Sequence, residues 1–400
     1  MAPILPYYCM IKSTHRAIID EVTFGLGDGL LERLTSHDVA AATFSNCTQS
    51  VKCTTDFLVL SSQRAADLGG QSGVVEAAKA VGAKSVLIVD LNATAYRVEA
   101  VLSGRIVIMS LPGGMPESEA IQFIATLLHG TGRALVRSDA SKRLYELAAR
   151  VANSDVSVFI NGPTGSGKEI MARFMHDQSP RQEKAFIAIN CAAIPDNMLE
   201  AMMFGHEKGA FTGASTTNVG VIRAADGGTL LLDEISEMSL QLQAKLLRAI
   251  QELTVTPVGG TKSIKVDVRI LATSNRDMAT ECRAGRFRDD LFYRLNVFPI
   301  GTQALCDRPE DIKPIAQELI MRHVKNVTEI PMLSNCAVDA LQAHSWPGNV
   351  RELENVIQRA LVLKSSSIIT SDSIMIDQLA TLNTQSQTLD VPASTARPVL

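Results

Sequence analysis

Apolar and polar positions alternate in blocks along the amino-terminal part of the chain, up to about residue 129. Short apolar runs occupy 38–44, 57–60, 85–89 and 106–109, and their length and composition are typical of buried parallel strands. Helical spacing marks 74–81, 93–102 and 117–128, and a first strand is expected near 7–11. This alternation predicts a small doubly wound α/β sheet.

The same patterns divide the remainder of the chain into an α/β core, a helical region and a polar ending. A helix is expected over 142–151 and a strand over 156–160, and a later helical region contains Trp346–Leu353. After about Ser365 the composition turns to Ser, Thr, Gln and Pro, which is typical of disorder. We therefore expect five segments: a doubly wound domain at 1–130, a linker at 131–138, an α/β core at 139–303, a helical lid at 304–370 and a disordered tail at 371–400.

Composition narrows the class of protein further. The chain has 400 residues and a formal net charge of −4, so bulk charge gives no argument for nucleic-acid binding. Its seven cysteines are scattered without a Cys-x-x-Cys pair, which favours free thiols in a reducing compartment. No apolar run approaches the roughly 20 residues that span a bilayer, and the start lacks the basic region of a signal peptide. We expect a cytoplasmic protein with no membrane association.

A glycine-rich turn after the strand at 156–160 has the spacing of a phosphate-binding loop. It reads Gly162-Pro163-Thr164-Gly165-Ser166-Gly167-Lys168-Glu169 and leads into a helical run that ends near His176. The glycines let backbone amides converge on phosphate oxygens, and Lys168 reaches the terminal phosphates. Glu169 replaces the usual hydroxyl residue that binds Mg²⁺. The alternative, a chance glycine turn, leaves the flanking strand and helix unexplained.

Two adjacent carboxylates end an apolar strand downstream of this loop. In Leu230-Leu231-Leu232-Asp233-Glu234, Asp233 is placed to hold Mg²⁺ and Glu234 to polarise an attacking water. A solvated strand end is the alternative explanation for such a pair. Because the phosphate loop lies at a suitable distance upstream, a nucleotide-hydrolysis site is the better interpretation.

A loop of small residues lies between these two halves of the site. It reads Gly209-Ala210-Phe211-Thr212-Gly213-Ala214, with glycines that allow a tight reversal and an aromatic residue at its tip. An exposed Phe211 would call for a partner, whereas in the alternative arrangement it folds back into the core. Physical chemistry alone leaves both arrangements open.

Together these three segments resemble the central domain of bacterial sigma-54-dependent transcription activators of the AAA+ class. The resemblance implies an ATPase with ATP and Mg²⁺, in which Asn190 is the switch partner of Glu234 and Asn275 senses the phosphate. The family commonly carries Glu at the position of Glu169. The hexapeptide is the family's contact with sigma-54 of RNA polymerase, and hydrolysis would move it to remodel the closed promoter complex.

The resemblance adds three arginines to the site. Arg288 and Arg294 would project into the neighbouring subunit's site, where a guanidinium supplies positive charge to the transferring phosphoryl group. Activity would then require a ring oligomer, with a hexamer expected. Arg351, in the lid, corresponds to the arginine that contacts nucleotide and couples lid position to its state. Cys306 stands where the family usually has arginine, and we expect this change to weaken packing between core and lid.

The amino-terminal domain resembles a receiver of two-component signalling in size and position, but lacks its chemistry. A receiver needs an acceptor Asp at the end of the third strand and an acidic pair near the first to hold Mg²⁺. Ser61-Ser62 follows the strand at 57–60, no acidic pair lies near 7–11, and Leu111-Pro112 stands where a receiver has Lys-Pro. Asp90 alone cannot assemble a metal site. A degenerate domain used for contacts is expected, with an unrelated ligand-binding fold as the alternative.

Further ligands and partners are expected from the two ends of the ATPase region. After Leu363 no pair of periodic helices forms a helix-turn-helix, so direct sequence-specific DNA binding is not expected. Action from solution, with a DNA-binding homologous activator, or by restraint of one are the alternatives, and the family's flagellar members favour a flagellar role. Leu135-Val136-Arg137-Ser138 resembles the segment through which some flagellar activators bind cyclic di-GMP, with Arg181 in support. A plain linker arginine is the alternative.

Two hypotheses for function follow. In the first, the protein is an ATP-hydrolysing regulator of transcription by sigma-54 RNA polymerase. In the second, it is a nucleotide-binding interaction protein that modulates or restrains a homologous activator without productive turnover of its own. The intact set of Lys168, Asp233, Glu234, Arg288 and Arg294 favours the first, whereas the unusual front domain and the expected lack of a DNA-binding end keep the second open.

Overall fold

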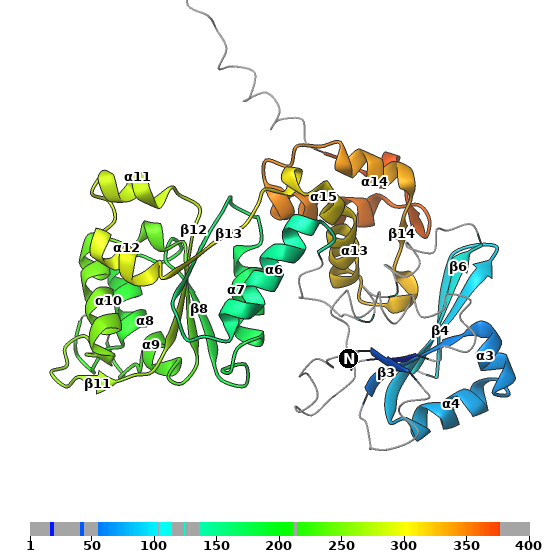
Figure 1. Ribbon diagram of the computed structural model, residues 1–400, viewed down its shortest axis with the longest axis horizontal. Coiled ribbons are helices and arrows are strands. Elements are labelled where there is room, and N and C mark those ends of the chain that lie inside the picture. The colour runs from blue at the N-terminus through cyan, green and yellow to red at the C-terminus, as the bar shows by residue number, and fades with distance from the viewer. Residues whose placement is uncertain are drawn as a thin grey trace, which may run out of the picture.

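The computed structural model describes residues 17–19, 41–43, 55–102, 104–113, 124, 128, 136–211 and 214–376. These residues form an amino-terminal sheet, a second sheet flanked by helices, and a helical lid (Figure 1). The expected linker residues 131–135 and the tail from 377 lie outside the described residues. Within the described ranges, no helix combines the length and the apolar character that crossing a bilayer requires.

The amino-terminal sheet has the strand order β2-β1-β3-β4-β6-β5. Its strands are β1 (Ala17–Ile19), β2 (Ala41–Thr43), β3 (Thr55–Ser61), β4 (Ala83–Ala93), β5 (Arg97–Val101) and β6 (Ile106–Pro112). The five strands other than β5 pair in parallel, with the first between the second and third, which is the doubly wound order of flavodoxin-like folds. Helices α3 (Ser62–Asp67) and α4 (Gln71–Ala80) bury one face of this sheet. The predicted receiver-like α/β fold is confirmed.

One detail of the predicted amino-terminal domain was wrong, and another lies outside the described residues. The expected helix at 93–102 is instead the strand β5, which pairs antiparallel with β6. Its Val98 is buried whereas Arg97 and Ala100 are exposed, and so short a segment does not distinguish a strand from a helix by its spacing. The first described strand is β1 rather than a segment near 7–11, which lies outside the described residues. Asp20 and Glu21 follow β1 directly in the sequence, so an acidic pair exists where none was expected.

The second sheet has the order β13-β7-β12-β9-β8, with every neighbouring pair parallel. Its strands are β7 (Val158–Asn161), β8 (Phe186–Asn190), β9 (Thr229–Asp233), β12 (Arg269–Ser274) and β13 (Phe298–Gly301). Helices cover both faces, so the central strands β9 and β12 are almost entirely buried, including Leu230, Leu231 and Leu232. Because all five strands are parallel, their carboxyl ends meet at one edge, which is where α/β folds bind ligands.

The elements around this sheet follow in chain order. They are α6 (Asp139–Ala152), α7 (Lys168–Asp177), α8 (Asp196–Phe204), α9 (Val221–Ala224), the 3₁₀ turn η1 (Ile235–Glu237), α10 (Leu240–Glu252), the hairpin β10 (Thr254–Val255) and β11 (Ile264–Lys265), α11 (Met278–Arg283) and α12 (Asp289–Leu295). Ser138 begins α6 by accepting a hydrogen bond from the Ser141 amide. The expected α/β core with a phosphate loop is confirmed as a fold.

The lid is built from three helices and short connections. They are α13 (Ile312–His323), α14 (Asn335–Gln342) and α15 (Asn349–Leu363), with the parallel pair β14 (Met332–Leu333) and β15 (Ile368–Ile369) and the turns η2 (Leu305–Asp307), η3 (Pro309–Asp311), η4 (Val327–Glu329) and η5 (Ser371–Ser373). Leu353, Val356, Ile357 and Ala360 of α15 are buried at helical spacing. The amino-terminal sheet contacts this lid, where the buried Tyr96 hydroxyl donates to the Ile330 carbonyl at 2.8 Å.

Candidate active site

The phosphate loop joins the end of β7 to the start of α7, as the sequence predicted. Gly165 and Gly167 have φ of 74° and 99°, in the left-handed region that favours glycine. A Cβ on Gly165 would lie 2.5 Å from the Gly348 carbonyl of the lid, so only glycine fits between the loop and the lid. The loop therefore places backbone amides and the α7 N-terminus at the carboxyl edge of the sheet.

Lys168 lies at the centre of this edge. Its Nζ donates to the carbonyls of Gly162 at 2.9 Å and Pro163 at 3.2 Å, and lies 3.7 Å from Glu234 Oε1. Burial lowers the pKa of Lys168, while the neighbouring carboxylates of Glu234 and Asp233 oppose that shift. A buried cation between a phosphate loop and two carboxylates is arranged to bind a terminal phosphate.

Asp233 and Glu234 leave β9 in different directions. Glu234 has a left-handed φ of 52°, which turns the chain into η1 and separates its side chain from that of Asp233. Thr273 on β12 joins the pair, since its hydroxyl donates to Asp233 Oδ1 at 2.6 Å and accepts from the Glu234 amide at 3.1 Å. The buried Glu234 Oε2 accepts no hydrogen bond from any described residue. This leaves it free to accept a proton from a water nucleophile.

Asn190 contacts the first of the two carboxylates rather than the second. Its register opposite Asp233 on neighbouring parallel strands brings the Nδ2 amide to 3.0 Å from Asp233 Oδ2. Its Oδ1 accepts from the amides of Ala192 and Ala193. The resemblance pairs Asn190 with Glu234, so this arrangement differs from the expected one, and the switch between them stays a prediction.

Asn275 and the lid hold the phosphate loop from opposite sides. Asn275 Nδ2 donates to the Thr164 hydroxyl at 2.9 Å, which places the expected sensor against the loop. From the lid, Asn349 Nδ2 donates to the Thr164 carbonyl and the Val350 amide donates to the Gly165 carbonyl, both at 3.0 Å. Arg351 lies beside the loop, because a Cβ on Gly165 would come within 3.2 Å of its Cβ.

Arg308 and Asp311 link core and lid, a role that the sequence analysis did not assign. The buried Arg308 donates to the Ser166 carbonyl at 2.7 Å. The fully buried Asp311 accepts hydrogen bonds from the amides of Arg137 and Ser138 and from the hydroxyls of Ser138 and Ser141. Cys306 is exposed and touches neither contact, so the packing loss expected there has no counterpart in these bonds.

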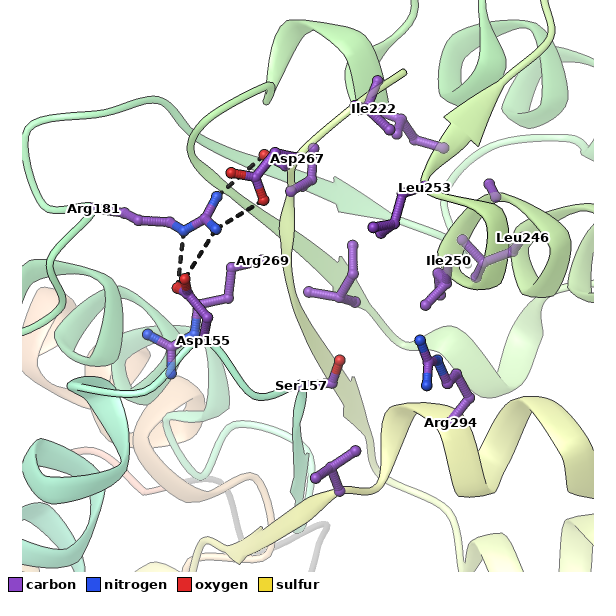
Figure 2. Close-up of a pocket in the computed structure, with 15 residues that line it drawn as sticks. Asp155, Ser157, Arg181, Ile222, Leu246, Ile250, Leu253, Asp267, Arg269 and Arg294 are labelled. Atoms are coloured by element: carbon purple, nitrogen blue, oxygen red, sulfur yellow. Dashed lines mark hydrogen bonds and ion pairs between the residues drawn. The ribbon is translucent and has the colours of Figure 1, made fainter. Parts of the chain in front are cut away.

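The two arginines expected to act on a neighbour lie away from this edge. Arg288 is exposed and forms a two-fold contact with Asp290. Arg294 lines a pocket with Ser157 and Arg269, which precede or begin β7 and β12, so it lies toward the amino ends of the strands (Figure 2). Arg288 is therefore at the surface of its own protomer, as action on a neighbour requires, whereas Arg294 lines this pocket.

The structure does not bring Arg137 and Arg181 together. Arg181 is held in the same pocket by Asp155 at 2.9 Å and Asp267 at 2.9 Å, and it also donates to the Gly228 and Asp267 carbonyls (Figure 2). Arg137 precedes α6, whereas Asp155 follows its end, so the helix separates them by roughly 20 Å at 1.5 Å per residue. Arg181 is thus part of an ion-pair network and not a partner of Arg137.

The loop at 209–214 projects from the base formed by His206 and Asn218. Phe211 is 45% exposed and its ring meets the His206 ring edge-on, with centroids 5.0 Å apart. Gly209 donates to the Ala214 carbonyl at 2.8 Å and closes the loop, while Thr212 and Gly213 lie outside the described residues. The alternative in which Phe211 is buried in the core is therefore wrong.

Two segments of the sequence match known protein families. Residues 134–301 match the sigma-54 interaction domain, and residues 306–390 match the AAA+ ATPase lid domain. The chain carries a sigma-54 interaction AAA+ domain. The expected resemblance is confirmed for these two segments of the chain.

Similar proteins include regulators from bacteria. The chain is 58% identical over 231 residues to the response regulator protein FleR of Pseudomonas aeruginosa, which covers 58% of this chain and 49% of FleR. It is 49% identical over 252 residues to the transcriptional regulatory protein FlbD of Caulobacter vibrioides, covering 62% and 55%. The chain spans about half the length of the curated relatives it matches.

A solved structure extends the likeness to the amino-terminal sheet. The crystal structure of NtrX from Brucella abortus in complex with ATP is 26% identical, with a TM-score of 0.57, over 90% of this chain and 86% of NtrX. The order of receiver-like sheet, sigma-54 interaction domain and lid is therefore shared. The residues of the site fit a nucleotide with Mg²⁺, because Mg²⁺ is usually held by one or two carboxylates together with substrate phosphates, and Asp233 lies beside the phosphate loop.

Proposed function

We propose that the protein is an ATP-hydrolysing regulator of transcription by sigma-54 RNA polymerase. The observation that carries the proposal is the convergence of Lys168, Asp233, Glu234 and Asn275 around one phosphate loop within a sigma-54 interaction domain. Lys168 would bind the terminal phosphate, Asp233 would hold Mg²⁺, and Glu234 would orient the water for in-line attack. Glu169, the first acidic residue of α7, would lie beside the phosphates.

In this proposal the site is completed by a second copy of the chain. Arg288 and Arg294 would reach the nucleotide of the neighbouring protomer in a ring, which we propose to be a hexamer, and Arg351 would contact it from the lid. The exposed position of Arg288 supports this arrangement. The rate per protomer should therefore rise with protein concentration until rings form.

The loop at 209–214 would carry the result of hydrolysis to the polymerase. We propose that Phe211 and its neighbours contact sigma-54, and that movement of the loop remodels the closed promoter complex. The half-exposed Phe211 ring supports this role, since a large exposed aromatic residue is well suited to a binding partner. A DNA-binding homologous activator and flagellar genes are the partner and the target that we propose, in the cytoplasm.

Reconstituted transcription from a sigma-54 promoter, with and without a DNA-binding homologue, tests the proposal. Open-complex formation that requires ATP and an intact Phe211 is the expected result. The second candidate function is a nucleotide-binding protein that restrains such a homologue, and the contact between Tyr96 and the lid favours it, because the amino-terminal sheet could hold the lid in one position. Binding without turnover, and repression of the homologue, would support that candidate instead.

We further propose that 1–130 is a receiver-like regulatory domain, 131–138 a linker, 139–303 the ATPase core and 304–370 the lid. The turn η5 (Ser371–Ser373) belongs with the lid, so the tail expected at 371–400 would begin after it. Cyclic di-GMP as a second ligand rests on Arg137 alone, because Arg181 is engaged by Asp155 and Asp267. Calorimetric titration of wild type and Arg137→Ala with cyclic di-GMP tests it.

A further inference from the structure

The side chain of Gln243 bonds both to the turn that follows Glu234 and to the backbone of Arg288. It is fully buried on α10, where its apolar neighbours Leu242, Leu246 and Leu247 pack into the core. A polar side chain at such a position needs every hydrogen bond it can form. Its three bonds therefore show what it holds in place.

Two of these bonds connect the turn that follows Glu234 with the residues just before Arg288. Gln243 Nε2 donates to the Met238 carbonyl at 2.8 Å and to the Arg286 carbonyl at 3.1 Å. Met238 ends the η1 turn that starts from Glu234. The amide group thus ties the end of that turn to the residues just before Arg288.

The third bond fixes Arg288 itself. Its backbone amide donates to Gln243 Oε1 at 2.8 Å, immediately before α12 begins. The η1 turn has other supports, because the Glu237 amide bonds to the Glu234 carbonyl and Ser274 bonds to Ser236. Loss of Gln243 should therefore displace Arg288 more than Glu234.

An ion-pair chain runs alongside the same connection. The buried Glu281 accepts from Arg286 Nε and Nη2 at 2.7 and 2.8 Å and lies 3.5 Å from Arg276, whose other nitrogen is 2.6 Å from Glu237. Arg286 lowers the pKa of Glu281. This chain links the residue after the sensor Asn275 with the segment that leads to Arg288, so the arginine segment is held from two sides.

We propose that Gln243 is a positioning residue that sets Arg288 for catalysis in the neighbouring protomer's site, with Glu281 in the same role through Arg286. The proposal rests on the proposed function, in which Arg288 acts on a neighbour. Gln243 touches no nucleotide and supplies no proton or charge. It holds the Arg288 backbone at a fixed distance from the turn after Glu234. A change at the nucleotide site of one protomer would therefore move the Arg288 that this protomer extends into its neighbour's site.

Mixed rings separate the two sides of each interface. Chains with Glu234→Gln keep Arg288 but cannot turn over ATP, so they are the arginine donors. Chains with Arg288→Ala keep their own nucleotide site but supply no arginine to a neighbour, so they are the site donors. A mixture should hydrolyse ATP faster than either chain alone, because some Arg288→Ala sites then face an intact Arg288. Each chain is next given Gln243→Met, which keeps the length of the side chain and removes its hydrogen bonds.

Gln243→Met in the arginine donor, the Glu234→Gln chain, should lower the ATPase rate of the mixture at least about ten-fold, because a displacement near 1 Å can lower a rate a hundred-fold. The same change in the site donor, the Arg288→Ala chain, should have a much smaller effect. Gln241→Leu, on the exposed face of the same helix, is the matched control and should leave both mixtures unchanged. Glu281→Gln should reproduce the asymmetry through a different contact if Gln243→Met does not fold.

Each result decides one question. A general loss of stability would lower both mixtures equally, and equal losses would overturn the proposal for Gln243 while leaving action in trans intact. If neither Gln243→Met nor Glu281→Gln affects one mixture more than the other, the proposal for Gln243 is likewise overturned. If the mixture without either change is no faster than its separate chains, action in trans is contradicted, and this proposal fails with it.

Discussion

The two large sheets of this chain both contain neighbouring parallel strands, but they carry very different side chains at the carboxyl ends of those strands. At the carboxyl ends of the ATPase sheet stand the phosphate loop, Asn190, Asp233 and Asn275, joined by hydrogen bonds. In the amino-terminal sheet, Ser61 ends β3 and Asp90 lies near the end of β4. Ser61 accepts from the Arg64 amide and begins α3, and Asp90 accepts from the Asn92 amide, so both serve the local backbone.

The difference shows that a doubly wound sheet provides a place for chemistry without supplying it. One sheet gathers groups from four strands around a phosphate loop, whereas the described ends of the other use their polar groups for helix and turn formation. The amino-terminal sheet instead contacts the lid through Tyr96. We therefore expect changes at the first edge to abolish turnover and changes at the second to alter stability only.

Lys168→Ala should have the largest effect. It removes the cation between the phosphate loop and Glu234, and we expect the ATPase rate to fall at least about a hundred-fold. Steady-state hydrolysis at saturating protein concentration measures this. Lys142→Ala removes an exposed lysine on α6 and is the control, which should leave the ATPase rate unchanged. Retention of activity by Lys168→Ala would show that hydrolysis does not take place at the second sheet.

Glu234→Gln should separate binding from turnover. Gln keeps the size of the side chain but cannot take a proton, so kcat should fall by about 10²–10⁴ while nucleotide affinity is retained. Single-turnover hydrolysis and nucleotide titration give the two quantities. Should kcat stay near that of wild type, the free Oε2 atom of Glu234 would not be the proton acceptor.

Phe211→Ala should distinguish hydrolysis from its use. The half-exposed ring lies outside the core, so the free energy of unfolding should change by no more than about 0.5 kcal/mol and hydrolysis should persist. Transcription from a sigma-54 promoter should be lost. Val362→Ala removes an even more exposed side chain from the lid and should leave transcription intact; equal transcription by both variants would argue against the loop.

Thr273→Val should have an intermediate effect on the same edge. The change keeps the shape but removes the hydroxyl that bonds to Asp233 and to the Glu234 amide. An unsatisfied buried group costs about 1–3 kcal/mol, so kcat should fall by about ten-fold or more and the melting temperature should drop. Thr256→Val, at an exposed position, is the comparison, and an unchanged kcat would show that Asp233 needs no such support.

Ser61→Ala should have the smallest effect. It removes the side-chain cap of α3, which is worth about 1 kcal/mol of stability, and ATPase activity should be unaffected. Acetyl phosphate should add no mass to the amino-terminal domain. Acid-labile phosphate on this domain, or a lower ATPase rate of Ser61→Ala, would mean that the edge of the amino-terminal sheet also takes part in chemistry.

How far the sequence predicted these two edges depended on the range of the contacts. The strand, glycine turn and helix around Lys168, and the apolar strand ending in Asp233, are local patterns and were predicted with their residues. Arg308, Asn349 and Gln243 were missed because their bonds join residues 142, 185 and 45 positions apart, which no local pattern indicates. The strand β5 was missed for a different reason, since five residues fit either period.

We propose above that two neighbouring copies of the chain hydrolyse ATP together at the carboxyl edge of the second sheet. The most direct test is the ATPase rate per protomer measured across a wide range of protein concentration, for wild type and for Arg288→Ala. We expect the wild-type rate to rise steeply and level off as rings form, while the variant forms rings and stays near background. A wild-type rate that is independent of concentration, or a variant as fast as wild type, would contradict the account.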